Sequence, residues 1–192
     1  MTSMDFVYIN LAALLVIECH KLSRAGIFYY STPQFDTQER NQKIVQDVKA
    51  ALASGRSPLV LTERKDHLFL LAEQLKGCTE HIITLYGGMG VKQRRLEMGK
   101  LTNLPAGTSR LIIATGKLIG ESFDDPQLDT LFLTMPISWR GTLQQYAGRL
   151  HRLHDGKKVV QIYDYIDENI PVLMRMFDKR MKGYRVMGYI TQ

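Results

Sequence analysis

Short runs of consecutive apolar residues, separated by amphipathic segments, constrain the fold of this chain more than any other feature. The runs lie at 58–62 (PLVLT), 81–86 (HIITLY), 110–114 (RLIIA), 130–135 (TLFLTM) and 158–165. A strand that is buried on one face alternates apolar and polar residues, whereas a continuous apolar run is typical of a strand covered on both faces. The sequence therefore predicts an α/β fold with a mainly parallel sheet and helices on both faces.

The segments between these runs carry helix signals. Residues 36–39 (DTQE) form a capping box, and apolar residues then recur at helical spacing as far as Gly55. Further helices are expected at 66–76, which is followed by Gly77, and at 91–104 and 170–184. We divide the chain into a segment at 1–34, which fits this pattern less well and contains a possible strand and helix, and a domain at 35–192.

Composition narrows the classes of protein that fit. The chain has 192 residues, of which 45% are hydrophobic and 23% charged, as in one ordinary globular domain. Its net charge of +6 gives mild support for an anionic partner. Cys19 and Cys78 lie far apart without metal-ligand spacing, which indicates a reduced, cytoplasmic setting. The apolar run at 6–17 is too short to cross a bilayer, so no membrane partner is expected.

The loops after the predicted strands share a polar, basic and glycine-rich character. They read TER at 62–64, YGG at 86–88, TGK at 115–117 and PIS at 136–138. In open parallel sheets the functional residues gather on loops at the carboxyl ends of the strands. These loops are therefore expected to form an anion-binding rim.

Residues 144–152 (QQYAGRLHR) form a further expected helix, which begins at Ser138 or Thr142. The second start makes a capping box with Gln145. At helical spacing four residues share one face, namely Gln145, Gly148, Arg149 and Arg152, while Tyr146, Leu150 and Leu153 share a packing face. A bare glycine between two guanidinium groups lets a bulky anion approach. The alternative is a solvated face whose arginines pair with neighbouring residues.

Four motifs occur together in an order that resembles a known family. Q-x-x-G-R-x-x-R at 145–152 resembles motif VI of superfamily-two helicases and translocases, and PLVLTER resembles motif IV. LYGGMGVKQRR resembles the H-G-x-M-x-x-x-x-R segment, and the stretch at 114–138 resembles motif V with its following strand. The chain thus resembles the second, C-terminal RecA-like domain of a DEAD/DEAH-type helicase, and it is similar to bacterial restriction-associated helicase modules.

The resemblance implies a role for individual residues. It makes Arg149 and Arg152 the catalytic arginine fingers. It places Gln145, Asp124 and Gly120 at the nucleotide, and it assigns no metal ligand. Nucleic acid would contact Thr62, Arg64, Gly88, Thr115 and Lys117.

Each of these roles has a plainer alternative, and one residue departs from the family pattern. Asp124 has the alternative of an Asp-Pro turn, and Arg64 that of a surface charge. Trp139 and Tyr146 are interpreted as packing residues rather than base-stacking platforms, and the histidines as structural or solvated. Ser122 stands where the family usually has glycine, which puts the geometry of that loop in doubt.

The family's first motor domain is represented weakly at most. ATGKL at 114–118 lacks the residues that complete a Walker A phosphate loop. LLVIECH at 14–20 resembles Walker B, but Ile17 replaces the Mg²⁺-holding Asp. The segment is therefore a remnant of a missing first domain or a coincidental strand and turn.

The resemblance also implies that the ATP site is shared between two domains. ATP and Mg²⁺ would bind only together with a first RecA-like domain that carries Walker A and Walker B, so the isolated chain is expected to be inactive. The other expected partner is DNA or RNA, with DNA favoured. The alternative is a stand-alone nucleic-acid-binding or regulatory module that docks on a partner ATPase domain.

Overall fold

The computed structural model describes residues 7–9, 38–116, 125–135, 143–152, 154, 157, 159–166, 170–186 and 189–191. Its strands are β1 (Val7–Ile9), β2 (Pro58–Thr62), β3 (His81–Leu85), β4 (Arg110–Thr115), β5 (Thr130–Leu133), β6 (Val160–Asp164) and β7 (Tyr189–Thr191). Its helices are α2 (Gln38–Ala53), α3 (Lys65–Gln74), α4 (Val91–Thr102), α6 (Gln144–Leu150) and α7 (Pro171–Val186).

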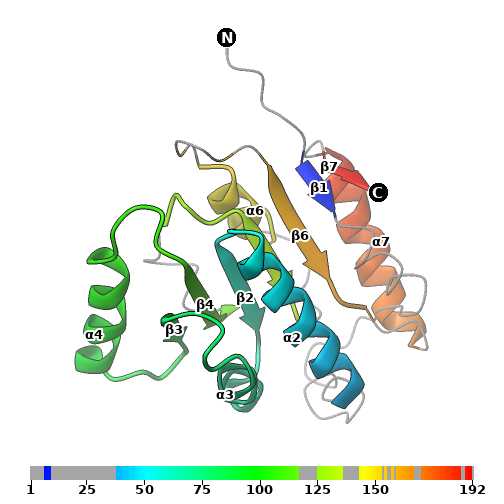
Figure 1. The fold of residues 1–192 in the computed structure, drawn as a ribbon. Helices are drawn as coiled ribbons and strands as arrows, with labels where there is room; N and C mark the ends of the chain where they lie inside the picture. The colour runs from blue at the N-terminus through cyan, green and yellow to red at the C-terminus, as the bar shows by residue number, and fades with distance from the viewer. Residues whose placement is uncertain are drawn as a thin grey trace.

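The described strands form one seven-stranded sheet in the order β3-β4-β2-β5-β6-β1-β7. Every described pairing between neighbours is parallel, so the carboxyl ends of the strands meet at one edge. Figure 1 shows α2 on one side of this sheet and α6 on the other. The predicted α/β architecture with a parallel sheet and helices on both faces is confirmed.

Burial on both faces explains the continuous apolar runs. In β2, Val60 packs with α2 and α3, whereas its neighbours Leu59 and Leu61 pack on the opposite face with residues of α4, α6 and α7. All three side chains are at most 3% exposed. Strand β2 has the predicted bounds because each of its residues faces one of two covered surfaces.

A buried ion pair fixes the terminal helix. Arg180 of α7, which is fully buried, donates from Nε to Asp164 Oδ2 at 2.7 Å and from Nη2 to Asp164 Oδ1 at 2.8 Å. The hydroxyl of Tyr184 donates to the same carboxylate at 3.1 Å. Burial and this carboxylate both raise the pKa of Tyr184. These contacts hold α7 against the end of β6, where a buried carboxylate is well satisfied.

The two ends of the described chain lie side by side. Strand β1 pairs with both β6 and β7, and Figure 1 shows β1 and β7 together at one edge. The expected strand in the segment at 1–34 is therefore present at residues 7–9, while the Walker B-like stretch lies outside the described residues. Sequence analysis did not predict β7.

Candidate functional site

A half-open hollow of about 340 Å³ lies at the carboxyl edge of the sheet, where Thr62 of β2 is paired with Thr115 of β4. Its lining comes from the loops after β2 and β3, from the start of α3 and from the last residue of β4. The lining residues are Glu63, Lys65, Gly87, Gly88 and Thr115. Two of the predicted nucleic-acid contacts, Gly88 and Thr115, thus belong to one site.

The glycine loop after β3 is tied to the end of β4. Gly87 N–H donates to the hydroxyl oxygen of Thr115 at 2.9 Å. Gly88 has a φ of +83°, a left-handed backbone conformation that residues other than glycine adopt only at a cost in conformational energy. Because the Thr115 oxygen accepts the Gly87 bond, its hydroxyl proton remains able to donate to an oxygen of a ligand. This part of the wall therefore suits a phosphate.

Lys65 supplies a positive charge at the same place. Its ammonium lies 4.5 Å from the centre of the Tyr86 ring, and Tyr86 directly precedes the glycine loop. A cation above an aromatic face is attracted to it, which restrains a side chain that is otherwise flexible. The contact keeps the ammonium at the wall of the hollow.

Thr62 and Arg64 do not line the hollow. The hydroxyl of Thr62 is buried and lies 3.0 Å from His67 Nδ1, while Arg64 N–H donates to Thr62 Oγ1 at 3.3 Å. His67 Nε2 lies 3.0 Å from the side-chain oxygen of Asn41, so this nitrogen donates and Nδ1 accepts the threonine proton. Thr62 thus shapes the turn between β2 and α3, and Arg64 is half-buried beside it. His67 is structural, as expected.

Helix α6 presents part of the predicted basic face. Tyr146, Ala147 and Leu150 are buried against the sheet, whereas Gln145 is exposed and Arg149 is half-buried. A Cβ added at Gly148 would meet nothing within 4 Å, so the space above the glycine is open. The helix ends at Leu150, two residues before the predicted end, and Arg152 lies exposed in the turn that follows it. Thr142 and Leu153 lie outside the described residues.

Tyr146 joins this helix to the hollow. Its hydroxyl donates to the carbonyl oxygen of Gly116 at 2.6 Å, directly after the wall residue Thr115. A Cβ at Gly116 would lie 2.5 Å from Glu63 Oε1 and 2.7 Å from the Tyr146 hydroxyl, so a larger residue there would displace one or both of these side-chain ends. Burial and then the Glu63 carboxylate raise the pKa of Tyr146, and Arg149 opposes them. The two halves of the candidate site therefore touch.

Several site residues were not assigned individual roles from sequence. Glu63 and Gly87, which line the hollow, and Gly116, which accepts the Tyr146 hydrogen bond, lie in the loops predicted to form the anion-binding rim. Lys65 was not identified, and Tyr146 was interpreted as a packing residue. The loops that follow the strands were identified, and that signal could have been extended to every residue in them. Asp124, Gly120 and Lys117 lie outside the described residues, as does Ser122.

Within the described residues, no group of histidine, cysteine, aspartate or glutamate side chains is arranged to hold a metal ion. Within the same ranges, no helix is long and apolar enough to span a membrane.

Two viral proteins are similar to this chain in sequence. The protein named Putative helicase 161L, from Invertebrate iridescent virus 6, is 28% identical over 166 residues, which cover 83% of this chain and 36% of that protein. Uncharacterized protein 108L, from Invertebrate iridescent virus 3, is 34% identical over 80 residues, which cover 42% of this chain and 72% of that protein. The chain thus spans little more than a third of the length of 161L. No model of a known protein family matches the sequence.

Two solved structures are similar in fold. T4 UvsW superposes with a TM-score of 0.65 at 15% identity, over 97% of this chain and 40% of that one. The C-terminal domain of the DEAD-box protein Dbp5 superposes with a TM-score of 0.57 at 15% identity, over 99% of this chain and 89% of that domain. The chain belongs to the same family as protein 108L, and its fold is that of the C-terminal RecA-like domain of superfamily-two helicases.

Proposed function

We propose that this chain is the second motor domain of an ATP-dependent nucleic-acid helicase or translocase. The observation that carries the proposal is the contact between two regions of different chemistry: Tyr146 of the arginine-bearing helix bonds to Gly116, at the wall of the hollow. A motor must link the site where ATP reacts to the site where the strand is held. The Tyr146–Gly116 hydrogen bond joins the two candidate regions.

The hollow is the proposed site for the nucleic-acid backbone. Lys65 offers a positive charge, the Thr115 hydroxyl a donor, and the Gly87-Gly88 loop a close backbone approach. Contacts of this kind bind phosphate and carry no sequence information. Arg64 and Lys117 would add charge beside the hollow, and Thr62 would act by shaping the turn that presents Lys65.

The face of α6 is the proposed contribution to the ATP site. Arg149 and Arg152 would reach the nucleotide phosphates across the cleft between two motor domains, with Gln145, Asp124 and Gly120 nearby. Guanidinium groups suit this role because they stay charged and bind phosphate oxygens in pairs. The open space over Gly148 fits a phosphate chain. The first RecA-like domain would supply the phosphate-cradling loop and the Mg²⁺ site, so the isolated chain is expected to lack ATPase activity.

Binding to single-stranded oligonucleotides tests this proposal. Fluorescence anisotropy with DNA and RNA oligomers should show weak binding with little sequence preference. The logarithm of affinity should fall with the logarithm of salt concentration by about 0.7 per phosphate contact. A lack of binding at low salt, or tight binding that ignores salt, would contradict the proposal.

A second candidate is a stand-alone nucleic-acid-binding or regulatory module that docks on a partner ATPase domain. The coding sequence upstream distinguishes the two. An adjoining reading frame with G-x-x-x-x-G-K-[ST] and D-E-x-H supports the motor domain, whereas the absence of one supports the module.

A further inference from the structure

We infer that Phe69 is a stacking platform for one base of a single-stranded nucleic acid whose phosphate lies in the hollow. The inference rests on the proposed function and deepens it, because it adds a base contact to a site so far described by phosphate contacts. It also implies that the bound nucleic acid is single-stranded there, because a base can lie against an aromatic side chain only where it is unpaired and unstacked.

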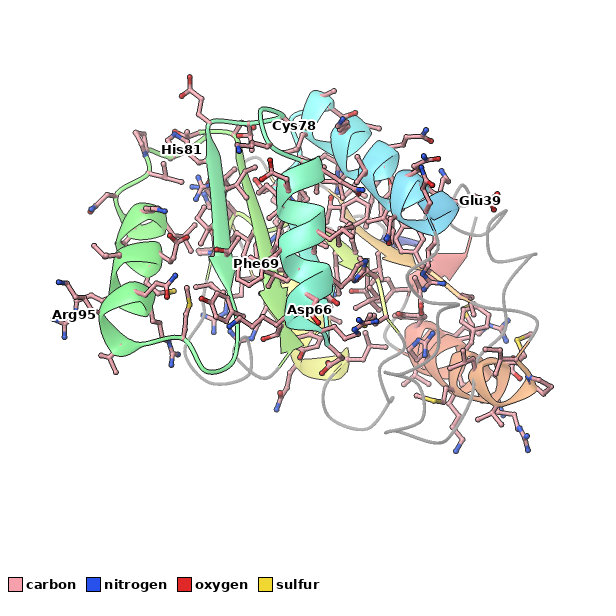
Figure 2. The ribbon with its side chains drawn as sticks, turned by 90° about the horizontal axis from the view of Figure 1, so that it is seen from below. Glu39, Asp66, Phe69, Cys78, His81 and Arg95 are labelled. Carbon is pink, nitrogen blue, oxygen red and sulfur yellow. The ribbon has the colours of Figure 1, made fainter. Side chains whose placement is uncertain are left out.

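Phe69 is an exposed aromatic, whereas most other large apolar side chains among the described residues are buried. Its side chain is 44% exposed, whereas Tyr146 on α6 is 1% exposed. Figure 2 shows Phe69 on α3, at the side of the helix toward β3. An exposed phenyl ring can present an apolar face to a ligand, and a base stacked on that face removes its surface from water, which is favourable.

Neighbouring side chains hold this ring in place. Phe69 meets the Tyr86 ring edge to face, with centroids 5.2 Å apart and an angle of 67° between the planes. Tyr86 is itself 7% exposed, and its hydroxyl donates to Gln93 at 3.3 Å. A braced ring loses little rotamer freedom when a ligand stacks on it, so the platform is largely pre-organised.

The platform lies beside the phosphate site. The ammonium of Lys65, which lines the hollow, is 5.8 Å from the centre of the Phe69 ring. Lys65 and Phe69 are one helical turn apart on α3, so they share a face. A nucleotide whose phosphate contacts Lys65 can therefore place its own base over Phe69. The positive charge next to the ring favours a ligand that carries both an anion and a flat apolar group.

Two matched oligomers separate base contacts from phosphate contacts. We would measure anisotropy with a fluorescent oligo-dT and with an abasic deoxyribose-phosphate oligomer of the same length. Phe69→Ala should weaken oligo-dT binding by about 5- to 150-fold, the range for loss of one stacked base. Its affinity for the abasic oligomer should stay unchanged. In Phe69→Trp, oligo-dT should be bound with quenching of the new tryptophan, and the abasic oligomer should cause none.

Leu70→Ala is the control, because Leu70 is the next residue on the same helix and is 39% exposed. It should leave both affinities unchanged. Circular dichroism melting of each variant checks that the fold is retained. If Phe69→Ala binds oligo-dT as wild type does, or if it weakens both oligomers equally, the stacking role is overturned while the proposed function stands. The exposed ring would then be assigned to a protein contact. If wild type binds neither oligomer at low salt, the proposed function fails as well.

Discussion

The hollow and the arginine face of α6 touch each other, yet they are built in opposite ways. The lining of the hollow is held by contacts within the chain, as in the Gly87–Thr115 hydrogen bond and the Lys65–Tyr86 contact. On the arginine face, Gln145 of α6 and Arg152 in the turn after it are exposed, with open space over Gly148. One region is a half-open hollow whose walls contact one another, and the other is an exposed surface.

This difference indicates how the two regions would act. A hollow whose lining is held by internal contacts can bind its ligand with groups fixed before the ligand arrives. An open arginine face can stabilise charge only against a ligand that a second surface also holds. We therefore expect substitutions in the hollow to change binding by this chain alone, and substitutions on α6 to change turnover only in a two-domain enzyme.

The largest expected effect tests the arginine face. In an enzyme reconstituted with a first RecA-like domain, Arg149→Lys or Arg152→Lys should lower ATP turnover by roughly 10³-fold or more, because lysine keeps the charge but loses the planar fork. Phosphate release measures turnover, and thermal melting should shift by a few degrees at most. Wild-type turnover in both variants would end the arginine-finger assignment. A loss of stability with retained turnover would favour pairing within the domain.

The next largest effect is a loss of stability, which we expect when the Tyr146–Gly116 hydrogen bond between the two regions is disturbed. Gly116→Ala places a methyl group against Glu63 and the Tyr146 hydroxyl, and it should lower the free energy of unfolding by about 1–3 kcal/mol. Tyr146→Phe removes the hydroxyl and should cost about 1 kcal/mol by itself. In the double variant the methyl group meets no hydroxyl, so the combined loss should be smaller than the sum of the two. Urea unfolding of all four proteins measures this, and strict additivity would show that the contact is not shared.

The smallest effect concerns one charge of the hollow. Lys65→Ala should reduce the salt dependence of single-strand binding by about 0.7 in the logarithmic slope, the value for one phosphate contact. Lys49, exposed on α2, provides the control, because it lies outside the hollow. Lys49→Ala should leave the slope unchanged. Equal slopes for the two variants would show that Lys65 does not contact a phosphate.

The sheet was predictable where a strand is covered on both faces. The bounds of β2 follow from its apolar run, because every one of its five residues is buried. Strand β7 has three residues and pairs with a strand near the other end of the chain, so no local pattern indicates it. Long-range pairing of short strands leaves little trace in a sequence.

The candidate site was predictable in part for a similar reason. The loops were identified because the carboxyl ends of parallel strands meet at one edge, which is a property of topology. The role of each side chain depends on its partners. The hydroxyl of Thr62 forms a hydrogen bond with His67, and the ammonium of Lys65 contacts the ring of Tyr86, which is 21 residues away in sequence. Such contacts exist only in three dimensions, so residue type and position alone could not separate a wall residue from a buried one.

The position of β1 affects the order in which the sheet can assemble while the chain is being synthesised. This strand lies between β6 and β7, so its two neighbours are about 150 residues or more further along the chain. At roughly 5–20 residues per second, the ribosome needs about 8–36 s to deliver them. Residues 7–9 cannot pair with either neighbour before then, whereas the central strands are available earlier. The pairings of β1 are therefore the later ones to form, and β7, whose described pairing is with β1, can join only after residue 191 has been synthesised.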